Sequence, residues 1–346
     1  FDSIGVGRAK VEEVASNRRV LGPDGKVALV RTSAAGKDPR AREAPEGLVD
    51  PLLRTLSFWN GETPLVALHY YATHPMSHYG EGRVSSDFAG LARRKRQEEQ
   101  PGVFQAYFTG CAGNVTAGKY NDGSDPLRGI LRDRLHAAMA AAWEATERQP
   151  ASELSWRVEP VRLPPRSESS FGAVESAKVL EDVAASVVRR NNAAIQLAWL
   201  QRQDRPIDLT ALHVGGAAVV HLPGEPFVEY QLAAQATAPD RFVCVAGYGD
   251  GGPGYIPTAD AYDQGGYEPT VALAGPGGEA VLKGAIGRLL GRRPARDRVH
   301  PPRPGRAGGS GLRATGGMKK GTARETRQAL VSIMSAFLFV RLRVSP

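Results

Sequence analysis

The sequence predicts an α/β fold, with mixed sheets flanked by helices and the active site in loops at strand ends. Up to residue 291, short apolar runs typical of buried strands alternate with segments whose apolar residues recur at helical spacing. Polar motifs directly follow several of these runs, where α/β proteins usually carry their chemistry. We therefore expect a folded domain over residues 1–291 and a separate tail over residues 292–346.

The first half of the chain predicts four strands and two helices. Strand-like segments lie at 26–32, 55–59, 64–75 and 102–110. One helix is expected over 85–100, where Ser or Asp provides the N-cap. A second is expected over 126–148, because proline stands near its start and apolar residues from Leu127 to Met139 recur at helical spacing.

The second half predicts a long helix, a hairpin and a helix–strand pair. Residues 174–202 read as one amphipathic helix, and residues 207–225 as a hairpin that turns at Gly215 and Gly216. A short helix follows over 226–238, and a strand over 241–252 runs into a glycine-rich loop.

The tail carries the positive charge of the chain. The net charge is +8, but residues 292–346 hold 13 Lys and Arg against two acidic residues, so the preceding residues are at −3. Its many Pro and Gly residues and few apolar ones predict disorder. We expect no nucleic-acid partner for the core, and any such role is confined to the tail. The last apolar run, of 12 residues, is too short to cross a bilayer, and no transmembrane segment is predicted.

Cysteine use and the first residues bear on compartment. Cys111 and Cys244 form neither a disulfide framework nor a zinc-binding pattern, and we expect two partly buried free thiols, with one disulfide left open. The chain starts at Phe1 and shows no signal peptide, as an internal or processed start would. Export is expected if the native chain has an upstream signal peptide. The sequence does not indicate an oligomeric state.

The segment "FTGCAGNVTAGKYND" contains a GxxxxGK pattern from Gly113 to Lys119 that resembles a phosphate-binding loop. Such a loop needs Ser or Thr after the lysine and a helix that starts there. Here Tyr120 follows, and "NDGSDP" is a cluster of turn formers. The phosphate-loop interpretation is therefore rejected.

Two residues at strand ends are candidate metal ligands. His74 ends the strand-like run "YYATHP", and a neutral imidazole there can bind zinc or simply hydrogen-bond a loop. His69 is expected on the opposite face of that strand, and His78 is expected to face solvent. Glu225 lies between the hairpin and the next helix, where it can bind a metal or cap the helix. Glu229, one turn later, is expected to be solvated.

Two loops add hydroxyl and phenol groups. The glycine-rich loop carries Tyr248, Tyr255, Tyr262 and Tyr267, which can bind a metal, donate to an oxyanion or serve as aromatic anchors. In the "GCAGNVTAG" loop, Thr116 offers a hydroxyl and Asn114 an amide beside small residues that allow a ligand to approach.

These segments resemble, in order, the catalytic domain of the neutral/alkaline (non-lysosomal) ceramidase family over roughly residues 55–285. "YYATHPMSHYGEGRVSSDFAG" is similar to the family segment with a zinc-ligating His, which implies that role for His74. "GCAGNVTAG" is similar to the "AGDVSPN"-type loop, and Thr116 falls at its active-site Ser. "LPGEPFVEYQLA" implies that Glu225 is a zinc ligand. "GYIPTADAYDQGGYE" implies Tyr255 as a ligand and Tyr267 as the phenol near the scissile carbonyl.

The chain departs from the family pattern at two places. The family's other zinc His comes from an upstream "THTHSG"-like segment, and nothing of that kind precedes His74, so the chain resembles a shorter bacterial member that lacks it. The resemblance thus implies a catalytic domain over residues 1–291 that is incomplete at its N-terminus. Thr116 replaces Ser and Ala117 replaces Pro, which favours a water-orienting role for the hydroxyl.

The sequence therefore predicts a zinc-dependent amidohydrolase acting on a small-molecule amide or lipid such as ceramide. In this hypothesis His74, Glu225 and Tyr255 bind Zn²⁺, Tyr267 donates to the oxyanion, and Thr116 with Asn114 positions water or the substrate amide. The alternative is a non-catalytic ligand-binding relative with an incomplete metal site. The two differ in whether bound ligand is turned over.

Overall fold

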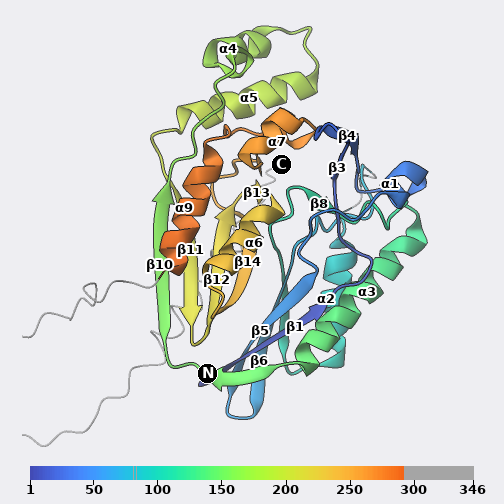
Figure 1. Ribbon diagram of the computed structural model, residues 1–346, viewed down its shortest axis with the longest axis vertical. Helices are drawn as coiled ribbons and strands as arrows, with labels where there is room; N and C mark the ends of the chain where they lie inside the picture. The colour runs from blue at the N-terminus through green and yellow to red at the C-terminus, as the bar shows by residue number, and fades with distance from the viewer. Residues whose placement is uncertain (81, 83, 292–346) are drawn as a thin grey trace, which may run out of the picture. The chain divides into compact units, whose positions relative to one another are not determined.

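A computed structural model of the chain describes residues 1–291, apart from residues 81 and 83. In this part, two larger sheets are flanked by helices, which confirms the predicted α/β class (Figure 1). The predicted tail, residues 292–346, lies outside the described residues.

The first sheet has five strands in the order β7-β6-β5-β1-β9. They are β1 (Ser3–Lys10), β5 (Leu52–Asn60), β6 (Thr63–Tyr71), β7 (Phe104–Thr109) and β9 (Glu147–Pro150). All neighbours are antiparallel except β6 and β7, which are parallel and joined through α2 (Asp87–Glu99). Together with α3 (Asp125–Glu144), α2 buries apolar residues against one face, in a core that includes Phe88, Leu131 and Leu135.

The second sheet has four strands in the order β10-β11-β12-β14. They are β10 (Leu154–Val161), β11 (Ile207–Val214), β12 (Ala217–Pro223) and β14 (Phe242–Gly249). The pair β12 and β14 is parallel, and the chain crosses between them through α6 (Val228–Thr237). Residues of α6 and of α9 (Gly278–Leu290) share a core with one face of this sheet.

The remaining faces of the two sheets pack on each other. Ile4, Leu56 and Tyr70 of the first sheet lie in one buried cluster with Val219 and Cys244 of the second. The order of layers is therefore helix, sheet, sheet, helix, with α2 and α3 on one side and α6 and α9 on the other (Figure 1).

Each sheet contains one parallel pair with a helical crossover, and this arrangement positions the candidate site. A crossover connection brings the carboxyl ends of both parallel strands to the same edge of the sheet. The segments that follow β6, β7 and β12 carry His74, Thr116 and Glu225, respectively, and Tyr248 lies at the end of β14. The two edges meet, because a Cβ added to Gly247 at the end of β14 would lie 2.9 Å from Gly110 O, just after β7.

Shorter elements complete the described part. They are β2 (Ser16–Asn17), β3 (Arg19–Leu21), β4 (Val27–Val30), η1 (Ala35–Lys37), α1 (Pro39–Glu43), β8 (Val115–Thr116), η2 (Ser169–Phe171), α4 (Ala173–Glu181), α5 (Val187–Gln201), β13 (Glu225–Pro226), β15 (Tyr255–Ile256), α7 (Ala259–Gln264) and α8 (Glu268–Val271).

The expected single helix over 174–202 is wrong. The chain forms α4 and α5, and residues 182–186 between them are not helical. Asp182 accepts a hydrogen bond from the main-chain N of Ala184, and Ser186 caps α5 by accepting one from Arg189 N. Asp and Ser side chains thus compete for main-chain groups, which ends one helix and begins the next.

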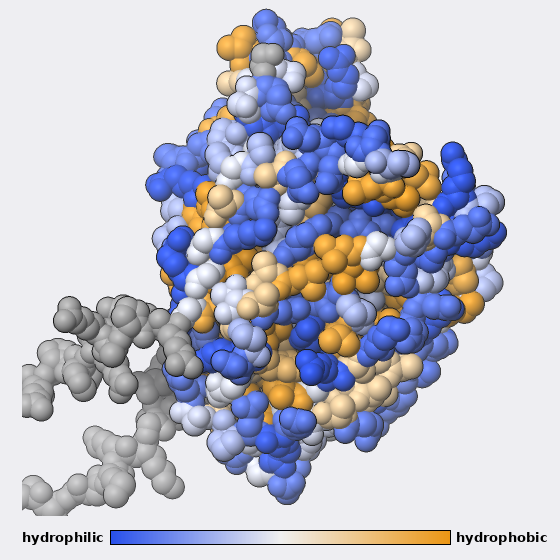
Figure 2. All heavy atoms as spheres, in the orientation of Figure 1, coloured by the Kyte–Doolittle hydropathy of each residue, from blue (hydrophilic) through white to orange (hydrophobic). Residues whose placement is uncertain are grey.

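Apolar side chains are exposed on α4, on α5 and in the segment between them. Val174, Val183, Val187 and Val188 are among the most exposed large hydrophobic residues of the described part. Figure 2 shows apolar patches interspersed among polar residues on the face it presents. No helix of the described residues is long and apolar enough to cross a membrane.

Candidate functional site

His74 and Glu225 lie in contact at the centre of the candidate site. His74 Nε2 is 2.9 Å from Glu225 Oε2, and both side chains are partly buried. The other ring nitrogen of His74, Nδ1, lies 3.0 Å from Val115 O. Because Val115 O and the Glu225 carboxylate can both only accept, an Nδ1 proton directed at Val115 O means that a second proton or a shared cation joins Nε2 to Glu225.

The main chain fixes the position of both residues. His74 N donates to Val115 O, and His74 pairs with Thr116 in an isolated parallel bridge. Glu225 N donates to Gly254 O, and Glu225 stands opposite Tyr255 in the parallel β13–β15 pair. The candidate ligands are thus held by strand-like pairing rather than by free loops.

Two glycines are required by close main-chain packing at this site. A Cβ on Gly113 would lie 2.3 Å from Glu225 O, a distance that forces a shift. Gly224 has φ +59°, and a Cβ there would lie 2.4 Å from Gly254 O. Only glycine accommodates both the positive φ and the close approach.

Tyr255 lies beside the His74–Glu225 pair and is held by an arginine. The ring centroids of His74 and Tyr255 are 6.2 Å apart, and Arg18 Nη1 donates to Tyr255 Oη at 3.0 Å. Burial raises the pKa of Tyr255 to about 12, although the Arg18 charge opposes this shift. The phenol is therefore neutral near pH 7 unless a cation binds its oxygen.

Arg18 belongs to a buried cluster of charges under the tyrosines. Its side chain is 12% exposed, and its Nε lies 3.4 Å from Oε1 of Glu268, which is fully buried. Arg19 Nη1 lies 3.1 Å from the other Glu268 oxygen and donates to it. Two arginines thus face one carboxylate, which leaves a net positive charge next to the phenols.

The other tyrosines of the glycine-rich loop separate into two groups. Tyr267 stacks edge-on against Tyr255 at 5.8 Å, and the Arg18 guanidinium lies 5.3 Å from its ring centroid. Tyr248 stacks edge-on against His74 at 6.0 Å. Tyr262 lies in α7 and donates to Ala274 O, away from this group. Tyr248, Tyr255 and Tyr267 surround the site, and Tyr262 is a structural anchor.

Asn114 is buried and connects the loop after β7 to α6. It is 1% exposed, its Oδ1 accepts from Val228 N, and its Nδ2 donates to Glu229 Oε2. Burial raises the pKa of Glu229, so the expectation that this carboxyl is solvated is wrong. The Asn114 amide reaches both helix residues because its loop packs directly on β13.

Thr116 lies next to His74 but is enclosed. It is 1% exposed, and its hydroxyl donates to Ser33 Oγ at 3.3 Å. Its main chain pairs with Ser16 in the short β2–β8 ladder, and Ser16 Oγ donates to Thr116 O. The structure therefore brings Thr116 to the site through its main chain.

The rejection of a phosphate-binding loop is confirmed. No helix follows Lys119 directly, and the next helix begins at Asp125. Lys119 Nζ donates to the main-chain oxygens of Arg42 and Ala44, at the end of α1. The ammonium group is used to hold that helix end.

The other two histidines of the 64–80 region lie elsewhere. His69 is fully buried within β6 and contacts Thr55 Oγ1 and Gln105 Oε1, whereas His74 lies beyond the end of that strand. The side chain of His78 is only 4% exposed, with Nε2 3.2 Å from Asp125, so the expectation that it faces solvent is wrong. The two cysteines are free and buried, which confirms the expectation of free thiols.

The donor atoms at the site meet part of what zinc requires. Zinc binds nitrogen and oxygen donors at about 2.0–2.2 Å and accepts three protein ligands when one position stays open. A separation of 2.9 Å between His74 Nε2 and Glu225 Oε2 lets both atoms contact one ion, with the Tyr255 phenol adjacent. Among the described residues there is no group of three or more His, Cys, Asp or Glu side chains that could hold a metal ion. The set fits zinc only if the phenol takes part.

Sequence reasoning missed Arg18, Arg19 and Glu268. Arg18 precedes the short strand β3, Arg19 begins it, and neither matches a catalytic pattern. Only the fold brings Arg18 to Tyr255, 237 residues later in the chain. The sequence offered one local signal for Glu268. It directly follows Tyr267 and is one of the few acidic residues in a segment rich in glycine and tyrosine.

A scan against models of protein families finds no match, and neither does a search of curated proteins. The fold is similar to the crystal structure of neutral ceramidase from Pseudomonas aeruginosa, with TM-score 0.58 and 18% sequence identity over 84% of this chain and 52% of that one. A ceramidase complexed with C2 matches with TM-score 0.58 and 17% identity, over 84% of this chain and 53% of the other. The chain spans about half the length of these proteins and shares their fold over most of its own length.

Proposed function

We propose that this chain hydrolyses the N-acyl amide bond of a ceramide-like lipid or a related amide with the help of zinc. The observation that carries the proposal is the contact between His74 and Glu225, 2.9 Å apart at the joined edges of the two sheets and beside Tyr255. The proposal also draws on the fold, which is similar to that of neutral ceramidases.

Zinc would be held by His74 Nε2, a carboxylate oxygen of Glu225 and the phenol oxygen of Tyr255. When bound, zinc supplies Lewis acidity at the amide carbonyl and makes water acidic enough to provide hydroxide near neutral pH. With Nδ1 donating to Val115 O, Nε2 would be the ring nitrogen that binds the ion.

The protein's own residues would support the reaction as follows. Water adds to the amide carbon, the C–N bond breaks, and the leaving nitrogen takes one proton of the water, which gives a carboxylic acid and an amine. Tyr267 would donate to the carbonyl oxygen as negative charge develops there. The Arg18 guanidinium, 5.3 Å from the Tyr267 ring centroid, adds positive charge beside this donor.

The loop after β7 would position the reacting groups. Asn114 fixes this loop to α6 through Val228 N, and Thr116 fixes His74 through main-chain pairing. Because both side chains are almost fully buried, we propose that they orient water or the substrate amide by holding the loop rather than by attacking the carbonyl.

The proposal is tested with an N-acyl sphingosine that carries a fluorescent acyl chain. We expect the zinc-loaded chain to release the fluorescent acid, and a His74→Ala variant to release at least about 100-fold less. The matched control is Glu98→Gln, at an exposed position of α2. If the zinc-loaded chain releases no acid, or if His74→Ala is as active as the control, the proposal is wrong.

The alternative is a ligand-binding protein without turnover. It is favoured by the hydrogen bond from Arg18 to Tyr255 Oη, since a cationic group already occupies the phenol oxygen that a metal would need. This alternative predicts saturable binding of the same N-acyl sphingosine with no acid released in the presence or absence of zinc.

A further inference from the structure

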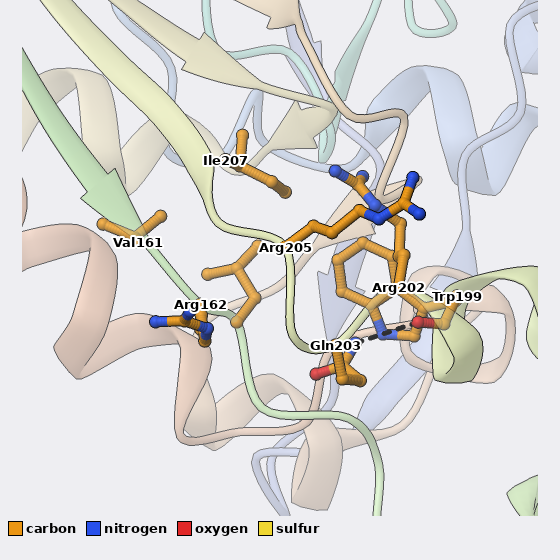
Figure 3. Close-up of a pocket in the computed structure, with 8 residues that line it drawn as sticks. Val161, Arg162, Trp199, Arg202, Gln203, Arg205 and Ile207 are labelled. Atoms are coloured by element: carbon orange, nitrogen blue, oxygen red, sulfur yellow. Dashed lines mark hydrogen bonds between the residues drawn. The ribbon is translucent and has the colours of Figure 1, made fainter.

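A small cavity lies where α5 turns into β11, beside the end of β10 (Figure 3). Its walls include Arg162, Leu163, Trp199, Arg202, Arg205 and Ile207. Its enclosed volume is about 10 Å³, room for one water-sized group. None of the proposed catalytic residues lines it, so it is separate from the candidate site.

Three arginine side chains line this cavity without an acidic partner. Arg202 Nη1 donates to Gly251 O at 2.6 Å, and Arg162 Nη2 donates to Asp204 O at 2.9 Å. Arg205 is exposed and has no side-chain hydrogen bond to any described residue. Within the described part of the chain, no carboxylate lies within 4.0 Å of these three groups. Most of their donor capacity is therefore available to a ligand.

The wall of the cavity contains a further donor. Trp199 is 4% exposed, yet its indole Nε1 has no hydrogen-bond partner among the described residues. A buried N–H without a partner is unfavourable and is often satisfied by a bound group. The nearby carbonyl of Trp199, at the end of α5, already accepts from Gln203 Nε2 and Arg202 N, so it is not a free acceptor that faces the cavity.

We propose that Arg202 and Arg205 bind an oxyanion of the phosphate class at this cavity. A cluster of guanidinium donors with no acidic partner matches a group that has several acceptor oxygens and up to two negative charges. The enclosed space admits one oxygen, and the rest of the anion lies at the arginine-lined mouth. Figure 3 shows the guanidinium groups of Arg202 and Arg205 on one side of the cavity and that of Arg162 on the other.

The anion site is connected to the candidate active site by a short loop. Arg202 holds Gly251 O, and Gly251 lies between Tyr248 and Tyr255 in the sequence. A phosphate group at the cavity therefore lies at the far end of the loop that presents both phenols. The proposal does not depend on the amide hydrolysis proposed above, because it concerns binding at a different site.

The test is calorimetric titration of the full chain with inorganic phosphate at constant ionic strength, with chloride replacing phosphate in the blank. We expect saturable binding that weakens at least tenfold in Arg205→Gln. This variant is expected to fold, because Arg205 makes no side-chain hydrogen bond to the described residues. Arg94→Gln, at an exposed position of α2, is the matched control. Trp199→Phe, which removes only the indole donor, is expected to weaken binding severalfold.

A second arm distinguishes free phosphate from a lipid headgroup. Flotation with phosphatidylcholine vesicles, with and without phosphatidic acid, measures binding to a phosphate group on a membrane. Binding in either arm that is lost in Arg205→Gln and kept in Arg94→Gln supports the site. If neither ligand binds, or if Arg205→Gln binds as tightly as the control, the proposal is overturned.

Discussion

His74 Nε2 lies 2.9 Å from Glu225 Oε2, although 151 residues separate the two in the chain. His74 follows β6 in the first sheet and Glu225 follows β12 in the second. The contact therefore forms only when both sheets are folded and packed on each other. It joins the two halves of the described part and brings a nitrogen and an oxygen donor to one point.

Replacing Glu225 by Gln tests this contact as a metal site. Gln keeps the size of the side chain but removes the negative charge that favours a cation. We expect zinc affinity, measured by competition with a chelating dye, to fall at least about 100-fold. Glu98→Gln should leave the affinity unchanged. Equal zinc affinity in both variants would exclude Glu225 as a ligand.

Arg18 and Arg19 offer a matched pair of variants at Glu268. Both arginines contact this fully buried carboxylate, but only Arg18 reaches Tyr255 and Tyr267. Without either arginine, the buried Glu268 carboxylate is incompletely paired. We therefore expect Arg18→Gln and Arg19→Gln each to lower the free energy of unfolding by about 3 kcal/mol. Urea denaturation measures this.

The two variants should differ in activity. At a temperature where both are folded, we expect Arg18→Gln to lower kcat for the fluorescent amide at least tenfold, because the phenols lose their positioning partner. Arg19→Gln should keep a kcat near that of the unmodified chain. Equal losses of kcat would show that Arg18 acts only through stability.

Gly113→Ala tests the packing of the loop after β7 against Glu225. The added methyl group would lie 2.3 Å from Glu225 O, and main-chain atoms cannot move away at low cost. We expect a loss of about 1–3 kcal/mol in the free energy of unfolding, together with weaker zinc binding. The control is Gly102→Ala, where the methyl group meets open space. A Gly113→Ala variant as stable as this control would contradict the packing.

Much of the fold can be predicted from local sequence patterns, because the spacing of apolar residues and the positions of turn residues are read within short segments. The hairpin at Gly215 and Gly216 and the strand that ends before His74 were predicted because each depends on a short segment. The strands β1 and β10 were not predicted. In β10, apolar Leu154, Trp156 and Val158 are exposed at the edge of a sheet, so their alternation does not indicate which face is buried.

The candidate site was predicted only in part, for a related reason. His74, Glu225 and Tyr255 follow strand ends, and the sequence indicates strand ends. Arg18 and Glu268 reach the site through pairing between distant segments, which no local pattern encodes. The break between α4 and α5 was missed because the helical periodicity of the segment is a stronger sequence signal than single Asp and Ser residues. The side chains of Asp182 and Ser186 nevertheless bind main-chain N–H groups, which ends one helix and begins the next.

The two thiols should be unreactive in the folded chain. Cys111 and Cys244 are fully buried, and burial raises the pKa of Cys111 and raises that of Cys244 to about 12. Because the thiolate is the reactive form, we expect Cys244 to react with a disulfide reagent at pH 8 about a thousandfold more slowly than an exposed thiol. In urea, where the chain is unfolded and both thiols are exposed, both should react rapidly. Rapid reaction of either thiol in the native chain would contradict this.

His69 should make the stability of the chain depend on pH below neutrality. Its ring is fully buried between Thr55 and Gln105, and burial lowers its pKa from 6.5 to about 4. Between these values the unfolded chain binds a proton that the folded chain does not, so the free energy of unfolding falls as pH falls from about 6.5 to 4. Since one pKa unit corresponds to about 1.4 kcal/mol, a difference of about 2.5 gives a loss of about 3.5 kcal/mol from this residue.

Urea denaturation at a series of pH values measures this dependence, and a His69→Gln variant is the comparison. The variant is expected to be less stable at pH 7, because it loses the ring contacts, but its stability should change less between pH 6.5 and 4. NMR titration of the histidine ring signals gives the pKa of His69 directly. The expectation is contradicted if the pKa of His69 in the folded chain is near 6.5, or if the free energy of unfolding depends equally on pH in both proteins. Either result would show that water reaches the ring. The first sheet would then have to open around β6, the strand that leads to His74.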